Sequence, residues 1–315
     1  MPGIDMSRLS EGVTLRPEVA RDVWAEALED SSVARLVPHM TLPGSGITID
    51  TVTSEPEAEW VGETEEKPVG KHGFGVKQMT PYKMALIELY SDEFKRDKAA
   101  LYNEISRRLP KALGRLLDRT VLYGTAPGSN FDVLSDAPLY TLGTGATIGR
   151  DILAINRQIA ASGASLSGWA LSPQGEAEMI GATGPGGALI FTQDFRSEIN
   201  MSRILGKPVS IAKAMYREAG ANPATTPELV GLAGDFSQAR LGIVQSVKMK
   251  ATTEATVNVD GDQINLWQRN MFGLLVEMEV GFIVNDKNAF VRIGGPVVDA
   301  DEGEDLGEDE EPIEP

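Results

Sequence analysis

Residues 47–78 constrain the fold most, because they are extended in character and poor in side chains that could form a core. Two segments, 47–51 and 74–78, alternate apolar and polar residues as strands do. Between them lies SEPEAEWVGETEEKPVGKHG, which is rich in Glu, Lys, Gly and Pro. A lone two-stranded ribbon is marginally stable in water, so something outside it has to support it. We expect an arm that lies on a neighbouring subunit rather than an ordinary surface loop.

A single helix of about thirty residues is predicted from Ser91 onward, because Ser91 can cap it and acidic residues follow at its positive end. Apolar side chains recur every four residues along it: Leu101, Ile105, Leu109, Leu113 and Leu117. Basic residues fall on its solvent side: Lys95, Arg96, Arg107, Arg108, Lys111, Arg115 and Arg119. Pro110 predicts a bend in this helix, and Gly124 predicts its end.

The clearest strand is predicted over 271–284. Every second residue from Phe272 to Val284 is apolar, while Glu277 and Glu279 fall on the opposite face. Shorter helices and strands come before it: helices at 148–162 and 173–180, and strands at 169–172, 209–211, 230–234 and 242–247. Residues 37–46 are interrupted by Pro and Gly and are predicted to be a loop.

The composition argues against several classes of function. The 315 residues include no Cys, which excludes disulfides, thiolate metal sites and cysteine nucleophiles. The only histidines are His39 and His72, both in predicted loops, which argues against a His-based catalytic triad or multi-His metal site. The formal net charge of −17 argues against binding to nucleic acid through phosphate neutralisation, and no apolar run has the length of a membrane span. We therefore expect no cofactor, no metal and no catalytic function.

The charge is concentrated at the end of the chain. Ten acidic residues and no Lys or Arg lie between Asp299 and Pro315. Such a segment repels itself and has little to bury, so a disordered acidic tail is predicted. We expect it to serve solubility or spacing, with docking of a partner as the alternative.

Several short motifs resemble the major capsid proteins of tailed bacteriophages. They occur in the family's order along residues 15–295: Trp60-Val61-x-Glu63 with Lys67-Pro68, Met79-Thr80-Pro81-x-Lys83, Ser91-Asp92-Glu93, Leu205-Gly206-Lys207-Pro208-Val209, Gly234-Asp235-Phe236, Arg269 before the long strand, and Ala289-Phe290-Val291. Each motif is weak alone, and the specificity lies in their order.

This resemblance implies the Hong-Kong-97-type capsid fold, of the α+β class. It divides the chain into consecutive parts: an N-terminal arm (1–46), an extended β-hairpin loop (47–85), a peripheral domain with a long spine helix (86–145), an axial α/β domain (146–255), long strands of the peripheral domain (256–284), a strand returning to the axial domain (285–298), and the acidic tail (299–315).

The resemblance also implies a function and partners. We expect the major head protein of a tailed double-stranded DNA bacteriophage, assembled in the host bacterial cytoplasm and located in the virion. Identical subunits would form pentamers and hexamers of an icosahedral shell with a portal protein, and a decoration protein is a further candidate partner. The arm begins almost at Met1, so a separate scaffolding protein is expected. The shell would enclose DNA without sequence-specific binding and without a membrane.

Some members of the family cross-link their shells, and alignment places Lys67, Asn270 and Glu277 at the positions involved. A neutral Lys67 amine would attack the Asn270 carboxamide and release ammonia, while Glu277 accepts the proton. Seven strand residues span about 23 Å, and an odd spacing places Asn270 and Glu277 on opposite faces, so neighbouring chains would have to complete the site. The alternative is that Lys67 and Asn270 are surface polar residues and Glu277 a structural ion-pair partner.

Two other functions remain open at this point. One is the shell protein of an encapsulin, a bacterial nanocompartment with the same fold that stores cargo enzymes. The other is a soluble α/β enzyme with an acidic tail, for which the sequence offers no supporting motif.

Overall fold

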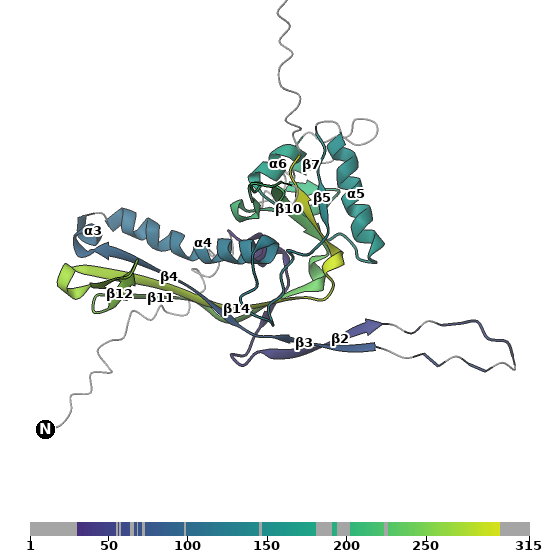
Figure 1. Cartoon of the computed structure of the whole chain (residues 1–315), viewed down its shortest axis with the longest axis horizontal. Coiled ribbons are helices and arrows are strands. Elements are labelled where there is room, and N and C mark those ends of the chain that lie inside the picture. The colour runs from purple at the N-terminus through teal and green to yellow at the C-terminus, as the bar shows by residue number, and fades with distance from the viewer. Residues whose placement is uncertain are drawn as a thin grey trace, which may run out of the picture.

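The computed structural model describes residues 30–296, with gaps at 55, 57, 64–65, 68, 71–72, 98, 145–146, 181–190, 194–201 and 224–225. Most of the predicted N-terminal arm, His72 and the acidic tail therefore lie outside the described residues. The described chain forms two large sheets and two two-stranded hairpins, and one of these hairpins, the predicted ribbon, projects away from both large sheets (Figure 1).

The first sheet has four strands in the order β1 (His39–Thr41), β11 (Ala239–Thr252), β14 (Met271–Val284) and β4 (Tyr82–Ser91). Only β1 and β11 run parallel, and the other neighbouring strands of this sheet are antiparallel. Strand β14 has the predicted bounds, and its alternate apolar residues are buried. Helix α4 (Ala99–Tyr123) covers the face on which they gather, so that Leu113 and Leu117 share a core with Phe272 and Phe282 (Figure 1).

The single helix predicted from Ser91 is two helices, α3 (Asp92–Asp97) and α4. The predicted start is confirmed, because Ser91 Oγ accepts a hydrogen bond of 3.2 Å from the backbone N–H of Phe94. Helix α4 has 25 residues and includes Pro110. The bend at Pro110 stays a prediction, and α4 ends one residue before Gly124, as predicted.

The second sheet has seven strands in the order β5 (Leu139–Thr141), β15 (Phe290–Gly294), β10 (Leu229–Gly234), β6 (Gly168–Leu171), β9 (Lys207–Ile211), β8 (Ser202–Ile204) and β7 (Phe191–Gln193). Helices α5 (Ile148–Ala161) and α6 (Pro173–Met179) flank this sheet, as the apolar spacing of α5 predicts (Figure 1). Ile152, Ile155 and Ile159 of α5 pack with Trp169 in a second core, which is separate from the core beneath α4.

Three smaller features complete the described chain. Strands β12 (Thr256–Val259) and β13 (Asp262–Asn265) form a hairpin. Its two-residue turn has positive φ at Asp260 and Gly261, as such hairpins require. Helix α2 (Ser32–Leu36) precedes β1, and short 3₁₀ turns lie at Lys213–Met215, Phe236–Gln238, Trp267–Arg269 and Lys287–Ala289.

The strand pairing contradicts the sequence expectation at residues 37–46 and bears on the range assigned to the axial domain. Residues 37–46 contain β1, so the loop predicted there was wrong. Its partner β11 lies about 200 residues later, where local sequence patterns cannot reveal it. Strand β11 also falls inside residues 146–255, the range that the resemblance assigns to the axial domain, yet it pairs with β14 along its length.

Candidate functional site

The predicted ribbon is formed by β2 (Ile47–Ser54) and β3 (Gly73–Met79), which pair antiparallel. Its root lies against the four-stranded sheet, where Met79 is fully buried with Leu42 and Ile283 in a small core of its own. Val76, three residues nearer the tip, is already 69% exposed. The chain therefore supports this ribbon at the root, and the intervening β-sheet hydrogen bonds hold its two strands together.

A charged contact fixes the root. The Asp132 carboxylate accepts hydrogen bonds from Lys77 Nζ at 3.1 Å and from the backbone N–H of Val284 at 2.9 Å. Lys77 Nζ also donates to the carbonyl oxygen of Val284, the last residue of β14. The Lys77 side chain of the ribbon, the Asp132 side chain after α4 and the backbone at the end of β14 thus meet at one point, which sets the direction in which the ribbon leaves the sheet.

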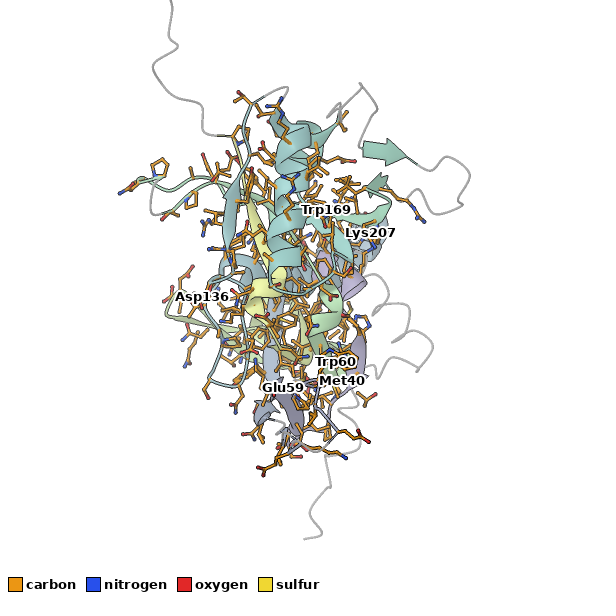
Figure 2. All side chains as sticks on the ribbon, turned by 90° about the vertical axis from the view of Figure 1, so that its right-hand side faces the viewer. Met40, Glu59, Trp60, Asp136, Trp169 and Lys207 are labelled. Atoms are coloured by element: carbon orange, nitrogen blue, oxygen red, sulfur yellow. The ribbon has the colours of Figure 1, made fainter. Side chains whose placement is uncertain are left out.

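The connection at the tip of the ribbon is exposed. Trp60 has a relative exposure of 104% and Val69 of 85%, while Glu63 and Lys67 are also exposed. Figure 2 looks from the side of the ribbon tip and shows Glu59 and Trp60 there. A Trp side chain is large and apolar, so its complete exposure in a single chain is consistent with a surface that a partner covers.

Asn270 lies just before β14, in the left-handed backbone region with φ 50° and ψ 50°. Its carbonyl oxygen accepts a hydrogen bond of 2.9 Å from the backbone N–H of Asp92, the first residue of α3. Asn tolerates this conformation better than most residues, so its backbone role alone accounts for its presence. The residue is exposed.

Glu277 lies on the face of β14 that points away from α4. Its carboxylate is 3.7 Å from Lys83 Nζ and 3.7 Å from Lys250 Nζ, and it is largely buried by them, with 17% of the side chain exposed. Lys83 also contacts Glu279 at 3.2 Å. The hydrogen bond to Glu279 and the charge of Glu277 raise the pKa of Lys83 above its ordinary value.

The structure does not bring Lys67, Asn270 and Glu277 together within one chain. Lys67 lies in the connection between β2 and β3, at one end of the molecule, whereas Asn270 adjoins the start of α3, at the opposite end (Figure 1). Glu277 is seven residues from Asn270 along β14, and its carboxylate forms ion pairs with Lys83 and Lys250.

Asp118 is a buried acidic residue to which the sequence analysis assigns no role. It is fully buried in α4, and its carboxylate accepts hydrogen bonds from Ser31 Oγ (2.6 Å) and from the backbone N–H groups of Ser32 (2.8 Å) and Val33 (3.1 Å). These groups form the N-terminus of α2. The sequence does indicate that Asp118 is buried. This acidic residue directly follows Leu117 and precedes Val121 by three positions, so it lies on the apolar side of the helix.

The described residues contain neither a candidate metal site nor a candidate membrane-spanning helix. No group of three or more His, Asp or Glu side chains in the described parts of this range could hold a metal ion. None of the helices described there is both long enough and apolar enough to cross a membrane.

The arrangement of the two sheets, long helix and ribbon matches solved phage structures. A chain from Mycobacterium phage Cain has a TM-score of 0.67 at 19% identity, covering 85% of this chain and 91% of that chain. A capsid chain of an empty GTA particle has a TM-score of 0.58 at 12% identity, covering 85% and 90% respectively. These likenesses define the class: the chain has the α+β Hong-Kong-97-type fold of a capsid subunit.

The sequence identifies the family. The family model described as the Phage capsid family matches residues 11–294, so the chain belongs to that family. It is 28% identical over 297 residues to the "Probable major capsid protein gp17" of Mycobacterium phage L5, covering 89% of this chain and 88% of that protein. It is 26% identical over 275 residues to the "Capsid polyprotein" of Pseudomonas phage PAJU2, covering 77% and 38%. The predicted family and fold are confirmed.

Proposed function

We propose that the chain is the major head protein of a tailed double-stranded DNA bacteriophage, which assembles as pentamers and hexamers into an icosahedral shell of the virion. The observation that carries this proposal is the ribbon, whose root is packed and whose tip exposes Trp60 completely. In a shell, a neighbouring copy would cover that tip and supply the support that its own chain lacks.

The sheets support a division into two domains. The seven-stranded sheet with α5 and α6 corresponds to the axial domain, and the four-stranded sheet with α3 and α4 to the peripheral domain. On this basis β11 belongs to the peripheral domain, because its hydrogen bonds join it to β14. The return strand β15 then carries the chain back into the axial domain beside β10.

The proposed partners are a separate scaffolding protein, a portal protein and further copies of the chain, with a decoration protein as an additional candidate. Assembly takes place in the host bacterial cytoplasm, and the shell encloses DNA without reading its sequence. The family assignment and the major capsid relatives favour this function over an encapsulin shell.

Electron microscopy of the protein co-expressed with its neighbouring genes tests the proposal. Closed shells with pentameric and hexameric clusters are expected, and hydrogen exchange in β2 and β3 should slow when shells form. A stable monomer whose ribbon is as protected as its core would contradict the proposal.

We also propose that neighbouring chains cross-link through the residues aligned above. The Lys67 amine of one chain attacks the Asn270 carboxamide carbon of another, an isopeptide C–N bond forms, and ammonia leaves. Glu277 takes the proton that the amine loses, and its partly buried position on the open face of β14 suits that role. Assembly would supply the apolar surroundings that neutralise the amine, since Lys67 is exposed in a single chain.

Denaturing electrophoresis of boiled, reduced shells distinguishes the two alternatives for these residues. Cross-linking predicts a ladder of multimers, which should disappear in Lys67→Ala and Asn270→Ala. Lys67→Arg is the matched control, because it keeps the positive charge but does not provide a neutral amine. A clean band near 33.8 kDa from intact wild-type shells would reject the bond.

A further inference from the structure

The outer face of α4 carries a basic stripe, defined here as Arg108, Lys111, Arg115 and Arg119. These residues recur at intervals of three and four, so they lie on one side of the helix, where Arg108 and Arg119 are exposed and Lys111 and Arg115 are half-buried. A concentrated basic surface stands out in a chain whose formal net charge is −17. The stripe contributes nothing to the core and does not belong to the ribbon.

The stripe is only partly neutralised by nearby carboxylates. Arg108 Nε lies 2.7 Å from Glu104, and Arg115 Nη1 lies 3.0 Å from Asp30. Neither Lys111 nor Arg119 forms an ion pair with a carboxylate in the part of the chain that the structure describes. Exposed ion pairs are weak and easily exchanged, so all four cations remain available to a polyanion.

We propose that the acidic segment 299–315 docks along this basic stripe of its own chain. The two surfaces are complementary in charge, with ten carboxylates in the segment and four cations in the stripe. Attraction between opposite charges needs no shaped pocket, because it is long-range and tolerates many registers.

A series of contacts connects the last described residues to the C-terminal end of α4. The Gly295 N–H donates a hydrogen bond of 3.3 Å to the carbonyl oxygen of Glu228. The adjacent residue Leu229 exchanges backbone hydrogen bonds of 2.9 Å with Arg217, whose guanidinium lies 5.4 Å from the centroid of the Tyr123 ring. Tyr123 is the last residue of α4, so this series of contacts connects the end of β15 to that helix, while the chain itself leaves the described structure from the seven-stranded sheet (Figure 1).

The segment is long compared with the stripe. The sequence after Pro296 has 19 residues, which span up to about 65 Å when extended. Arg108 and Arg119 are separated by about 16 Å along the helix axis. The docked segment would occupy the charges that could otherwise bind phosphate, and the free subunit therefore binds DNA weakly.

Carbodiimide coupling of the full-length unassembled subunit tests the contact, because it joins carboxylates to amines only where they touch. Mass spectrometry should find residues 299–315 linked mainly to Lys111, rather than to exposed lysines elsewhere such as Lys207 and Lys248. Salt near 1 M, where the Debye length is about 3 Å, should abolish the link.

Two sets of variants control this experiment. Lys111→Arg keeps the charge but removes the amine, so it should lose only the link at that position. Arg108→Gln combined with Arg119→Gln should reduce the link at Lys111 several-fold, whereas Lys207→Gln combined with Lys248→Gln should not. Links spread evenly over all exposed lysines would overturn the proposal, as would links found only between isotopically distinct copies.

DNA is the alternative ligand of the basic stripe. A truncation after Pro296 distinguishes docking of the acidic segment from binding of DNA. The truncated subunit should bind a double-stranded oligonucleotide more tightly than the full chain does, with a log–log salt slope of about −3.6 if all four cations contact phosphate. Equal affinity of the two proteins would mean that the segment does not cover the stripe, and the proposal would fail.

Discussion

The carboxylate of Asp118 accepts a hydrogen bond of 2.8 Å from the backbone N–H of Ser32, which lies 86 residues earlier in the chain. The same carboxylate also accepts hydrogen bonds from Ser31 Oγ and from the backbone N–H of Val33. It therefore provides partners for donors at the start of α2 that would otherwise lack them. This contact attaches the start of α2 to the C-terminal part of α4.

Burial raises the pKa of Asp118 to about 7, against the opposing effect of its three hydrogen bonds. The folded state therefore holds this proton more tightly than the unfolded chain does. The resulting stability is fully present below the ordinary pKa of 3.8 and is lost as the pH rises to about 7. We expect the free energy of unfolding to fall over that range, relative to the non-titrating variant Asp118→Asn.

Urea unfolding at several pH values measures this difference between wild type and Asp118→Asn. The negative charge of nearby Asp30, itself paired with Arg115, also raises the pKa of Asp118. Asp30→Asn is therefore the control, and it should shift the pH dependence of the wild type downward without removing it. A difference that stays constant from acid to neutral pH would refute the assignment.

Met79→Ala should destabilise the subunit by about 2–4 kcal/mol, because it removes a fully buried side chain from the root of the ribbon. The glycines at 242 and 281 make room for this side chain, since a Cβ at either position would lie within 2.7 Å of it. Val76→Ala, on the exposed part of the same strand, should change the stability by less than about 0.5 kcal/mol. Equal losses in chemical denaturation would show that the root is not a packed core.

Lys77→Met should loosen the ribbon while leaving the two sheets intact. It removes the hydrogen bonds from Nζ to Asp132 and Val284, at an expected cost of about 1 kcal/mol. Hydrogen exchange should accelerate in β2 and β3 of the subunit but not in β10 or β15. Lys250→Met removes a comparable lysine at the far part of the sheet, and accelerated exchange in the ribbon of that variant would contradict a local role for Lys77.

Trp60→Ser should leave the free energy of unfolding of the isolated subunit within about 0.5 kcal/mol of wild type, because the side chain is fully exposed. The same change should reduce the yield of closed shells, since the indole is expected to be buried against a neighbour. Trp60→Phe keeps an aromatic ring and should retain most assembly. Normal shell yield from Trp60→Ser, measured by sedimentation, would show that the tip makes no essential contact.

The sequence predicted those elements whose hydrophobic period is regular. The bounds of β14 agree with the prediction at both ends, and α5 ends one residue earlier than predicted. In each case one face is buried along the whole element, which leaves a repeating pattern. Strand β1 has only three residues and no such pattern, so only its partner β11 makes it a strand.

The features of the candidate site also include some that local sequence patterns predict and others that depend on distant contacts. The exposed ribbon, and with it the position of Lys67, followed from local alternation and from the lack of core residues around it. The contacts of Lys77 with Asp132 and of Asp118 with Ser32 join residues more than fifty positions apart. Neither pair leaves a periodic signal, because each depends on which elements become neighbours after folding.

By itself, the sequence determined the long strand, the amphipathic helices, the sparse ribbon and the acidic end of the chain. Each of these depends on local spacing, composition or charge, and local rules are sufficient to read them. Only the tertiary structure decided that β11 joins β14, that Asp118 holds α2, and that Lys67 and Asn270 lie at opposite ends of one subunit. These relationships arise when distant segments exclude water together, and no residue carries that information alone.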